Sequence, residues 1–201
     1  MEIINNHTYS EIKFDYMDFV EREIIGCKFI NCSFQNSKME NIITRRCDFS
    51  ECNFKAARLN TSFHEASAFT NCQFAYANVF CTHFSECKMV GSSFADVNMI
   101  GLEITRGDWS YTNLRMQNLK GLDLQHIKLV NADLCMCNLE KVNLRNADIS
   151  HAVLSQANLS GADLRDAKTD GLDFKSFSLK GVLVDIGQAV NIARAYGAIV
   201  G

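Results

Sequence analysis

The 201-residue chain contains no proline. Proline lacks a backbone N–H, so its absence favours a fold in which nearly every residue can donate to a hydrogen-bonded ladder. The chain also lacks a dominant sign of charge, because 20 Lys and Arg stand against 23 Asp and Glu, for a net charge of −3. This balance excludes a basic nucleic-acid-binding protein and a polyacidic tail.

Long apolar runs and a secretion signal are absent as well. No stretch approaches the roughly 18 apolar residues that a membrane span needs, and residues 1–14 have neither the basic start nor the apolar segment of a signal peptide. We therefore expect a soluble, cytoplasmic protein of one domain that spans no membrane. In a reducing compartment its nine cysteines should be thiols rather than disulfides.

What the sequence does contain is a repeat of five residues. Steps of five from Phe14 to Val184 give 35 positions, (184 − 14)/5 + 1, and 32 of them carry Leu, Phe, Ile, Met, Val or Trp. Only 47% of the whole chain is hydrophobic, so composition does not explain this phase. The residue two places earlier is usually small, as at Cys32 and Ala147, and the residue between is often Asp or Asn, which favour tight turns.

A period of five fits neither an α-helix nor a flat strand, and it indicates a β-solenoid with two inward residues on every side of a turning coil. The run NADLCMCNLEKVNLRNADISHAVLSQANLSGADLRDA at 131–167 resembles the A(D/N)LXX pattern of the pentapeptide-repeat family. The resemblance implies an all-β fold, a right-handed quadrilateral β-helix with one pentapeptide per side, 20 residues per coil and about eight and a half coils. With strands about 4.8 Å apart, the rod would be roughly 40 Å long.

The chain then divides into an N-terminal cap at 1–11, the β-helix at 12–184, and a C-terminal helix and dimerisation tail at 185–201. A weak signal favours a strand at Met1–Ile4. Asp185 and Gln188 have the spacing of a capping box and predict a helix at 186–196 that ends at Gly197.

The predicted helix has two apolar stripes. Ile186, Val190 and Ala193 form one, and Ile192 and Tyr196 form the other. One stripe can cover the last coil, and the second, together with the apolar residues that follow the helix, then favours a dimer across this end. The alternative is a single wide stripe that covers the end of a monomer.

The tail LKGVLVDIGQAVNIARAYGAIVG is similar to the endings of the Qnr and MfpA proteins, pentapeptide-repeat proteins that bind DNA gyrase and protect it from fluoroquinolones. The resemblance implies a tail-to-tail homodimer shaped like a DNA duplex, with an interface at Val184, Ile192, Tyr196, Ile199 and Val200. The unbroken repeat is more similar to MfpA than to the Qnr proteins, whose coils carry projecting loops.

Candidates for chemistry are few. Seven cysteines, Cys27, Cys32, Cys47, Cys52, Cys72, Cys87 and Cys137, occupy the small inward position and are expected to be packing residues. Their linear arrangement offers a metal poor ligand geometry, and no catalytic motif stands out, so we expect no metal, no cofactor and no enzyme. Thr44 and His64 replace central apolar residues. A local shift that turns Phe63 inward and His64 outward is expected, and Trp109 is expected to be a large central residue or a bulge.

A DNA mimic should carry acidic residues on its surface. A loose acidic band surrounds the middle coils and is the expected gyrase-facing surface: Asp48, Glu51, Glu65, Glu86, Glu103 and Asp108. Lys88 and Arg106 interrupt it. The leading hypothesis is a DNA mimic that binds DNA gyrase or topoisomerase IV and counters fluoroquinolones or gyrase-directed toxins, with no nucleic acid as a partner. The alternative is a solenoid scaffold that binds another protein along its flat sides.

Overall fold

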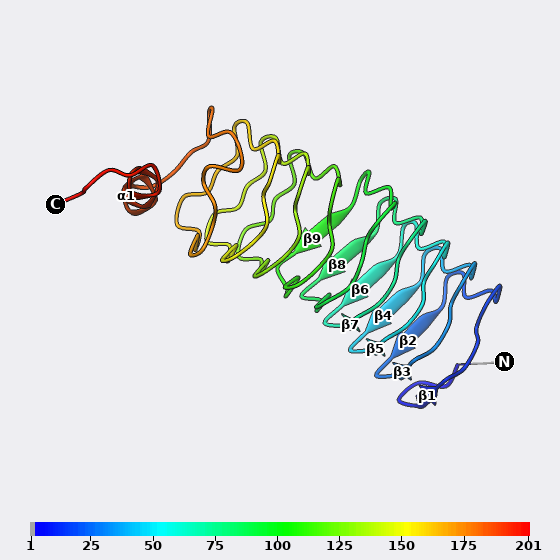
Figure 1. The fold of residues 1–201 in the computed structure, drawn as a ribbon. Coiled ribbons are helices and arrows are strands. Elements are labelled where there is room, and N and C mark those ends of the chain that lie inside the picture. The colour runs from blue at the N-terminus through cyan, green and yellow to red at the C-terminus, as the bar shows by residue number, and fades with distance from the viewer. Residues whose placement is uncertain (1–2) are drawn as a thin grey trace.

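The computed structural model describes residues 3–201 and has the form of a coil that rises along one axis, with a helix at its C-terminal end (Figure 1). Each turn of the coil takes 20 residues, since Thr8 pairs with Lys28 and Lys28 with Asp48, always in parallel. Bridges keep the same register as far as the pair Asp163 and Leu183. The predicted β-helix, right-handed and four-sided, is confirmed, with one five-residue unit per side.

Two parallel sheets hold the regular strands. The first contains β1 (Thr8–Ser10), β3 (Lys28–Ile30), β5 (Asp48–Ser50) and β7 (Ala68–Thr70); the second contains β2 (Glu23–Ile25), β4 (Ile43–Arg45), β6 (Phe63–Glu65), β8 (His83–Ser85) and β9 (Glu103–Thr105). The helix α1 (Ile186–Ala195) follows the last coil. We name the four sides of the coil by their first central residues in the repeat: the Phe14, Phe19, Ile24 and Phe29 sides. The first sheet lies on the Phe29 side and the second on the Ile24 side.

The coil begins earlier than the sequence predicts. Strand β1 lies inside the expected N-terminal cap and pairs with β3, and the buried Tyr9 takes the central position of its side. Ile3 and Ile4 lie in no strand, while Met1 and Glu2, the other half of the expected first strand, lie outside the described residues.

The corners follow from a left-handed backbone two residues after each central position. Asn36 and Met116, for example, have φ of 55° and 62°. This conformation strains residues other than glycine, but it points the amide at the next coil: the Asn36 N–H donates to the Lys55 carbonyl at 3.0 Å. The ladder thus compensates for the strained corners, and a proline there would remove the donor.

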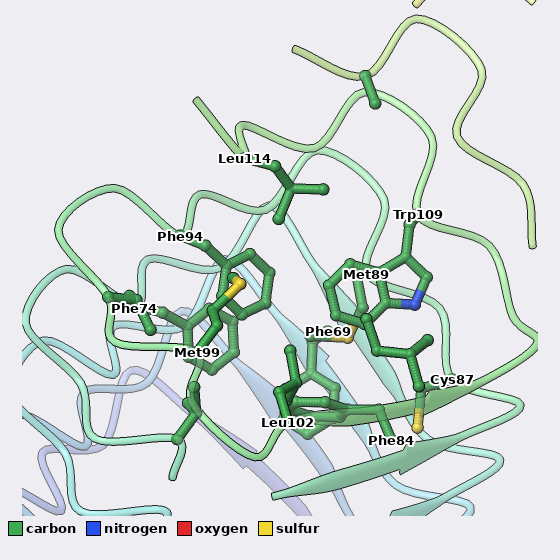
Figure 2. Packing of buried hydrophobic residues seen from close by; sticks show 14 of the residues in the cluster. Phe69, Phe74, Phe84, Cys87, Met89, Phe94, Met99, Leu102, Trp109 and Leu114 are labelled. Carbon is green, nitrogen blue, oxygen red and sulfur yellow. The ribbon is translucent and has the colours of Figure 1, made fainter. Parts of the chain in front are cut away.

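The interior consists of side chains stacked along the axis. Phe34 lies between Phe14 and Phe54 with ring centroids 4.9 and 5.0 Å away, nearly parallel to both. Towards the middle of the chain the stack changes to Phe94 against Trp109 at 5.3 Å (Figure 2). Trp109 is fully buried, so it is a central residue and not a bulge. Beyond it the central residues are mostly leucines, beginning with Leu114.

The ladder is interrupted between residues 95–106 and residues 115–126. No backbone hydrogen bond or bridge joins these two described segments, which follow each other on the Phe19 and Ile24 sides. On the Phe29 side the same two coils remain joined, for example by the Trp109 N–H to the Lys128 carbonyl at 2.7 Å. We call this interruption the seam.

The seam coincides with oversized inward residues. The inward position most often holds Cys, Ala, Ser or Thr, but it holds Val97 and then Gln117 on the Phe19 side, and Leu102 and then Leu122 on the Ile24 side. A single bulky pair does not interrupt the ladder, since Leu122 is followed by Val142 and the Asn143 N–H still donates to the Leu122 carbonyl at 3.0 Å. The seam is the level at which bulky pairs occupy two neighbouring sides.

Candidate functional site

The six acidic residues of the expected gyrase-facing band are spread over two adjacent sides. Glu65 and Glu103 lie in β6 and β9 on the Ile24 side, and Asp48 and Asp108 lie on the Phe29 side. Glu51 and Glu86 stand at two different corners, exposed and with a left-handed backbone. The solenoid therefore brings these residues to one flank of the rod.

Basic side chains lie beside part of this charge. Arg45 pairs with both Glu23 and Glu65, and His83 Nδ1 lies 3.3 Å from Glu103 Oε2. On the Phe29 side the sign alternates from coil to coil. Asp108 stands in register between Lys88 and Lys128, and Asp48 next to Lys28.

Four members of the band, Asp48, Glu51, Glu86 and Asp108, form no ion pair within the described part of the chain. Asp48 and Asp108 are half-buried and stand in register with lysines, whereas Glu51 and Glu86 are exposed at corners. Because unpaired exposed acids offer a partner the most accessible negative charge, these two corners carry most of the electrostatic potential that the band can present.

At the C-terminal end, Asp185 and Gln188 form the predicted capping box. The Asp185 carboxylate accepts from the Gln188 N–H at 2.9 Å, and the Gln188 side-chain oxygen accepts from the Asp185 N–H at 3.1 Å. The two backbone N–H groups that donate to Asp185, from Gln188 and Asp166, lower the pKa of this carboxyl. Gln188 is itself buried, and its Nε2 donates to the carbonyls of Leu164 and Ala167 at 2.6 and 2.9 Å. One glutamine thus starts the helix and satisfies carbonyls of the last coil.

These hydrogen bonds set the rotation of α1 about its own axis. This rotation differs from the expected one, in which the Ile192 stripe faces away from the coil. Ile192 and Ala195 pack against the core in line with Gln188, while Ile186, from the other stripe, is 86% exposed. The pattern of apolar residues alone predicted that Ile192 faces away from the coil. The stripe that faces the coil begins with a glutamine.

The outer surface of this end is apolar. Leu183, Ile186, Tyr196 and Ile199 are all exposed, and Ile199 is fully so. Of the other expected interface residues, Val184 and Val200 are half-buried. The Tyr196 hydroxyl donates to the Phe174 carbonyl at 3.3 Å, which fixes the ring at the edge of the last coil. We call the four exposed side chains the C-terminal apolar patch. Exposed apolar side chains at one end of the chain are candidates for contact with a partner.

The prediction for His64 is wrong. His64 is buried in phase with the repeat, and Phe63 lies half-exposed. The imidazole Nδ1 lies 2.8 Å from Thr44 Oγ1, one coil before, and Nε2 lies 2.9 Å from Ser62 Oγ. Burial lowers the pKa of His64 to about 3. The interior accepts the ring because hydroxyl groups satisfy both of its nitrogens.

The seven cysteines predicted as packing residues are buried, and all nine cysteines are free thiols. Burial raises the pKa of Cys87 and of Cys137 to about 12, which makes them poor nucleophiles. Among residues 3–201 no group of three or more His, Cys, Asp or Glu side chains could hold a metal ion. Within the same residues no helix has the length and apolarity to cross a membrane.

Comparison with known proteins agrees with this architecture. The family model of the pentapeptide repeats matches in 8 copies, at residues 27–63, 127–166 and 137–175. The chain belongs to the pentapeptide-repeat proteins. A search of the curated proteins found no match.

Several solved structures share the fold of this pentapeptide-repeat protein along nearly its whole length. A trypsin-treated variant of QnrB1, a plasmid-mediated fluoroquinolone resistance protein, is 21% identical, with a TM-score of 0.87 over 98% of this chain and 99% of that chain. Full-length QnrB1 is 20% identical, with a TM-score of 0.81 over 95% and 100%. HetL, involved in heterocyst differentiation regulation in the cyanobacterium Nostoc sp. strain PCC 7120, is 18% identical, with a TM-score of 0.70 over 90% and 88%.

Proposed function

We propose that this pentapeptide-repeat protein imitates DNA, binds DNA gyrase or topoisomerase IV, and protects the enzyme from fluoroquinolones or gyrase-directed toxins. The observation that carries the proposal is the end-to-end correspondence with QnrB1, which covers nearly all of both chains. A shared fold does not by itself determine function. The proposal therefore also rests on the acidic flank and on the C-terminal apolar patch.

The dimensions are compatible with such a role. A rod of about 40 Å, doubled tail to tail through the C-terminal apolar patch, measures roughly 80 Å. Duplex DNA rises about 3.4 Å per base pair, so the dimer would replace roughly 24 base pairs on a DNA-binding surface. The unpaired Glu51 and Glu86 would stand in for phosphates at the corners.

A supercoiling assay with purified gyrase, with and without ciprofloxacin, tests the proposal. We expect the wild-type protein to restore supercoiling and to reduce quinolone-stabilised cleavage, and we expect Glu51→Lys with Glu86→Lys to weaken both effects. Glu11→Lys is the matched control, because Glu11 occupies the same corner column as Glu51 but lies outside the band. The loss should shrink as salt rises, since exposed charges are screened within about 10 Å at 0.1 M.

A solenoid scaffold for another protein is the second candidate. The observation in its favour is the partial compensation of the acidic band by Arg45 and the lysines of the Phe29 side. If the wild-type protein neither binds gyrase nor changes quinolone-stabilised cleavage at low salt, the DNA-mimic proposal fails and the scaffold hypothesis is favoured.

A further inference from the structure

Two neighbouring cavities open along the seam. One has a volume of about 600 Å³ and lies on the Phe19 side between residues 95–100 and 113–118. The other has a volume of about 480 Å³ and lies on the Ile24 side between residues 102–106 and 122–126. Both volumes fall within the range of roughly 300–1,000 Å³ that is typical of ligand sites. Together they follow the direction of the chain around one corner of the coil.

The walls of the seam present backbone groups that are paired elsewhere in the ladder. One coil later, the Gly121 N–H donates to the Glu140 carbonyl and the Leu124 N–H to the Asn143 carbonyl, both at 2.8 Å. The equivalent amides of Gly101 and Ile104 have no such bond to the coil that follows them. Ile104 is buried whereas Gly101 is exposed. A buried backbone group without a partner is costly, so a ligand that supplies a partner at Ile104 gains binding energy.

Apolar side chains line the outer edge of the larger cavity. Ile100 is 60% exposed and Met116 is 70% exposed, and both belong to its lining. Tyr76 and Phe80, one coil earlier on the same side, are exposed too. This edge offers contacts to apolar side chains next to the unpaired backbone.

The charged residues that line the cavities limit the class of ligand that can bind. Asp96, Glu103 and Asp123 line the two cavities together with Arg106 and Arg115, and Arg115 lies 3.5 Å from Asp133. These nearly balanced charges offer no strong attraction to the phosphates of a nucleic acid. A small apolar molecule would leave the backbone groups unpaired, and a helix has its own backbone groups paired already.

We propose that the seam is a binding site for an extended, apolar and uncharged or weakly basic peptide segment of a partner protein. The segment enters as an additional strand between the two coils. Its main chain pairs with residues 95–106 and 115–126, and its apolar side chains contact Ile100 and Met116. Strand addition of this kind takes affinity from main-chain hydrogen bonds and specificity from pockets for alternate side chains. The proposal rests on the interrupted ladder and not on gyrase binding.

A peptide panel tests the site on the full chain. Fluorescein-labelled, end-blocked heptapeptides in which Thr alternates with Val, Ile, Leu or Phe are titrated by fluorescence polarisation. We expect at least one to bind with a Kd below about 1 mM, and the same peptide with alternate backbone nitrogens methylated to bind at least tenfold more weakly, because methylation removes the donors.

Two methionines of one corner column locate the binding. Met116→Lys at the seam should weaken binding of the best peptide by about tenfold, whereas Met136→Lys, one coil later and also at an exposed left-handed corner, should change it less than about twofold. Both substitutions add the same charge at equivalent backbone positions. A difference in peptide affinity between the two variants therefore locates the binding site at the seam.

Hydrogen exchange gives a second measurement. The amides of Gly101 and Ile104 should exchange rapidly in the free protein and slowly with peptide bound, while the Trp109 amide, which is paired on the intact Phe29 side, should be protected in both. The proposal is overturned if no peptide of the panel binds, if the methylated peptide binds equally well, or if Met136→Lys weakens binding as much as Met116→Lys.

Discussion

A thiol or hydroxyl at the inward position both fills space and donates a hydrogen bond. Cys137 Sγ lies 2.8 Å from the Leu114 carbonyl and Thr82 Oγ1 lies 2.7 Å from the Leu59 carbonyl, each 23 residues earlier in the chain. The donor therefore reaches the central residue of the coil before. Alanine would be enough to fill this space. The frequent Cys, Ser and Thr also donate a hydrogen bond to a buried carbonyl. A five-residue phase shows that the position is inward, but not where its donor points.

The thiols provide a prediction at the same scale. In native protein at pH 8, a thiol reagent should modify one cysteine rapidly, Cys81, because it is exposed. Burial raises the pKa of Cys72 well above its usual value and that of Cys87 to about 12, so these groups stay protonated and inaccessible. Mass spectrometry before and after denaturation counts them. Cys81→Ser should abolish the rapid phase, and rapid native labelling of Cys72 or Cys87 would contradict the packing role.

His64 makes stability depend on pH in a defined window. Burial lowers its pKa from 6.5 to about 3, so the unfolded chain binds a proton between these values and the folded chain does not. The contribution of neutral His64 to the free energy of unfolding is fully present above pH 6.5 and decreases as the pH drops towards 3. At pH 4 the loss should be roughly 3 kcal/mol.

Urea unfolding at pH 7 and pH 4 measures this loss. His64→Phe should flatten the dependence of stability on pH, because it removes the titrating ring. The variant should fold, since the same column accepts a phenylalanine at Phe84, and Thr44 and Ser62 keep hydroxyl neighbours in Ser67 and Thr82. A substitution of the exposed His151 is the control. A His64→Phe protein that loses as much stability at pH 4 as the wild type would contradict the assignment.

At the scale of elements, α1 depends on one polar contact with the coil. Gln188→Ala removes the donor to the Leu164 and Ala167 carbonyls and half of the capping box. We expect a loss of about 1–3 kcal/mol from unsatisfied buried carbonyls and faster hydrogen exchange in α1 and the last coil. Asn191→Ala, on the exposed side of the same helix, is the matched control. Equal exchange in the two variants would show that Gln188 does not hold the helix.

The helix also shows where sequence patterns reach their limit. Its start was predictable, because Asp185 and Gln188 stand at the spacing of a capping box. Its orientation was not, since the same Gln188 also bonds two carbonyls of the last coil, and only the closed coil places those carbonyls beside it. The seam was not predicted from the sequence for a related reason. Leu102 and Leu122 are 20 residues apart, and their succession matters only once the coils are stacked.

At the scale of the whole molecule, the solenoid has two parts with different interiors. Aromatic stacks dominate up to Phe94 and Trp109, and leucines dominate from Leu114 onwards. The seam lies at this change of interior. Within residues 3–201, only two sides of the coil carry the connection there, so we expect the rod to bend more easily at the seam than in the coils before it. A partner strand bound in the seam would join the parts on all four sides.

The length of the proposed assembly depends on the C-terminal apolar patch. We expect the wild-type protein to be a dimer at micromolar concentration in sedimentation velocity, and Ile186→Asp with Ile199→Asp to yield a folded monomer, because each change places a charge on a side chain that is 86% exposed or more and supports no core contact. Ile30→Asp, at an exposed isoleucine far from this end, should leave the dimer intact.

The same pair of variants links assembly to function. A monomer presents about 40 Å instead of roughly 80 Å to a DNA-binding surface, so the Ile186→Asp, Ile199→Asp protein should lose gyrase protection while its circular dichroism stays that of the wild type. Ile30→Asp should protect as the wild type does. A wild-type protein that sediments as a monomer would remove the tail-to-tail dimer, and a monomeric variant that still protects gyrase would show that one rod is long enough.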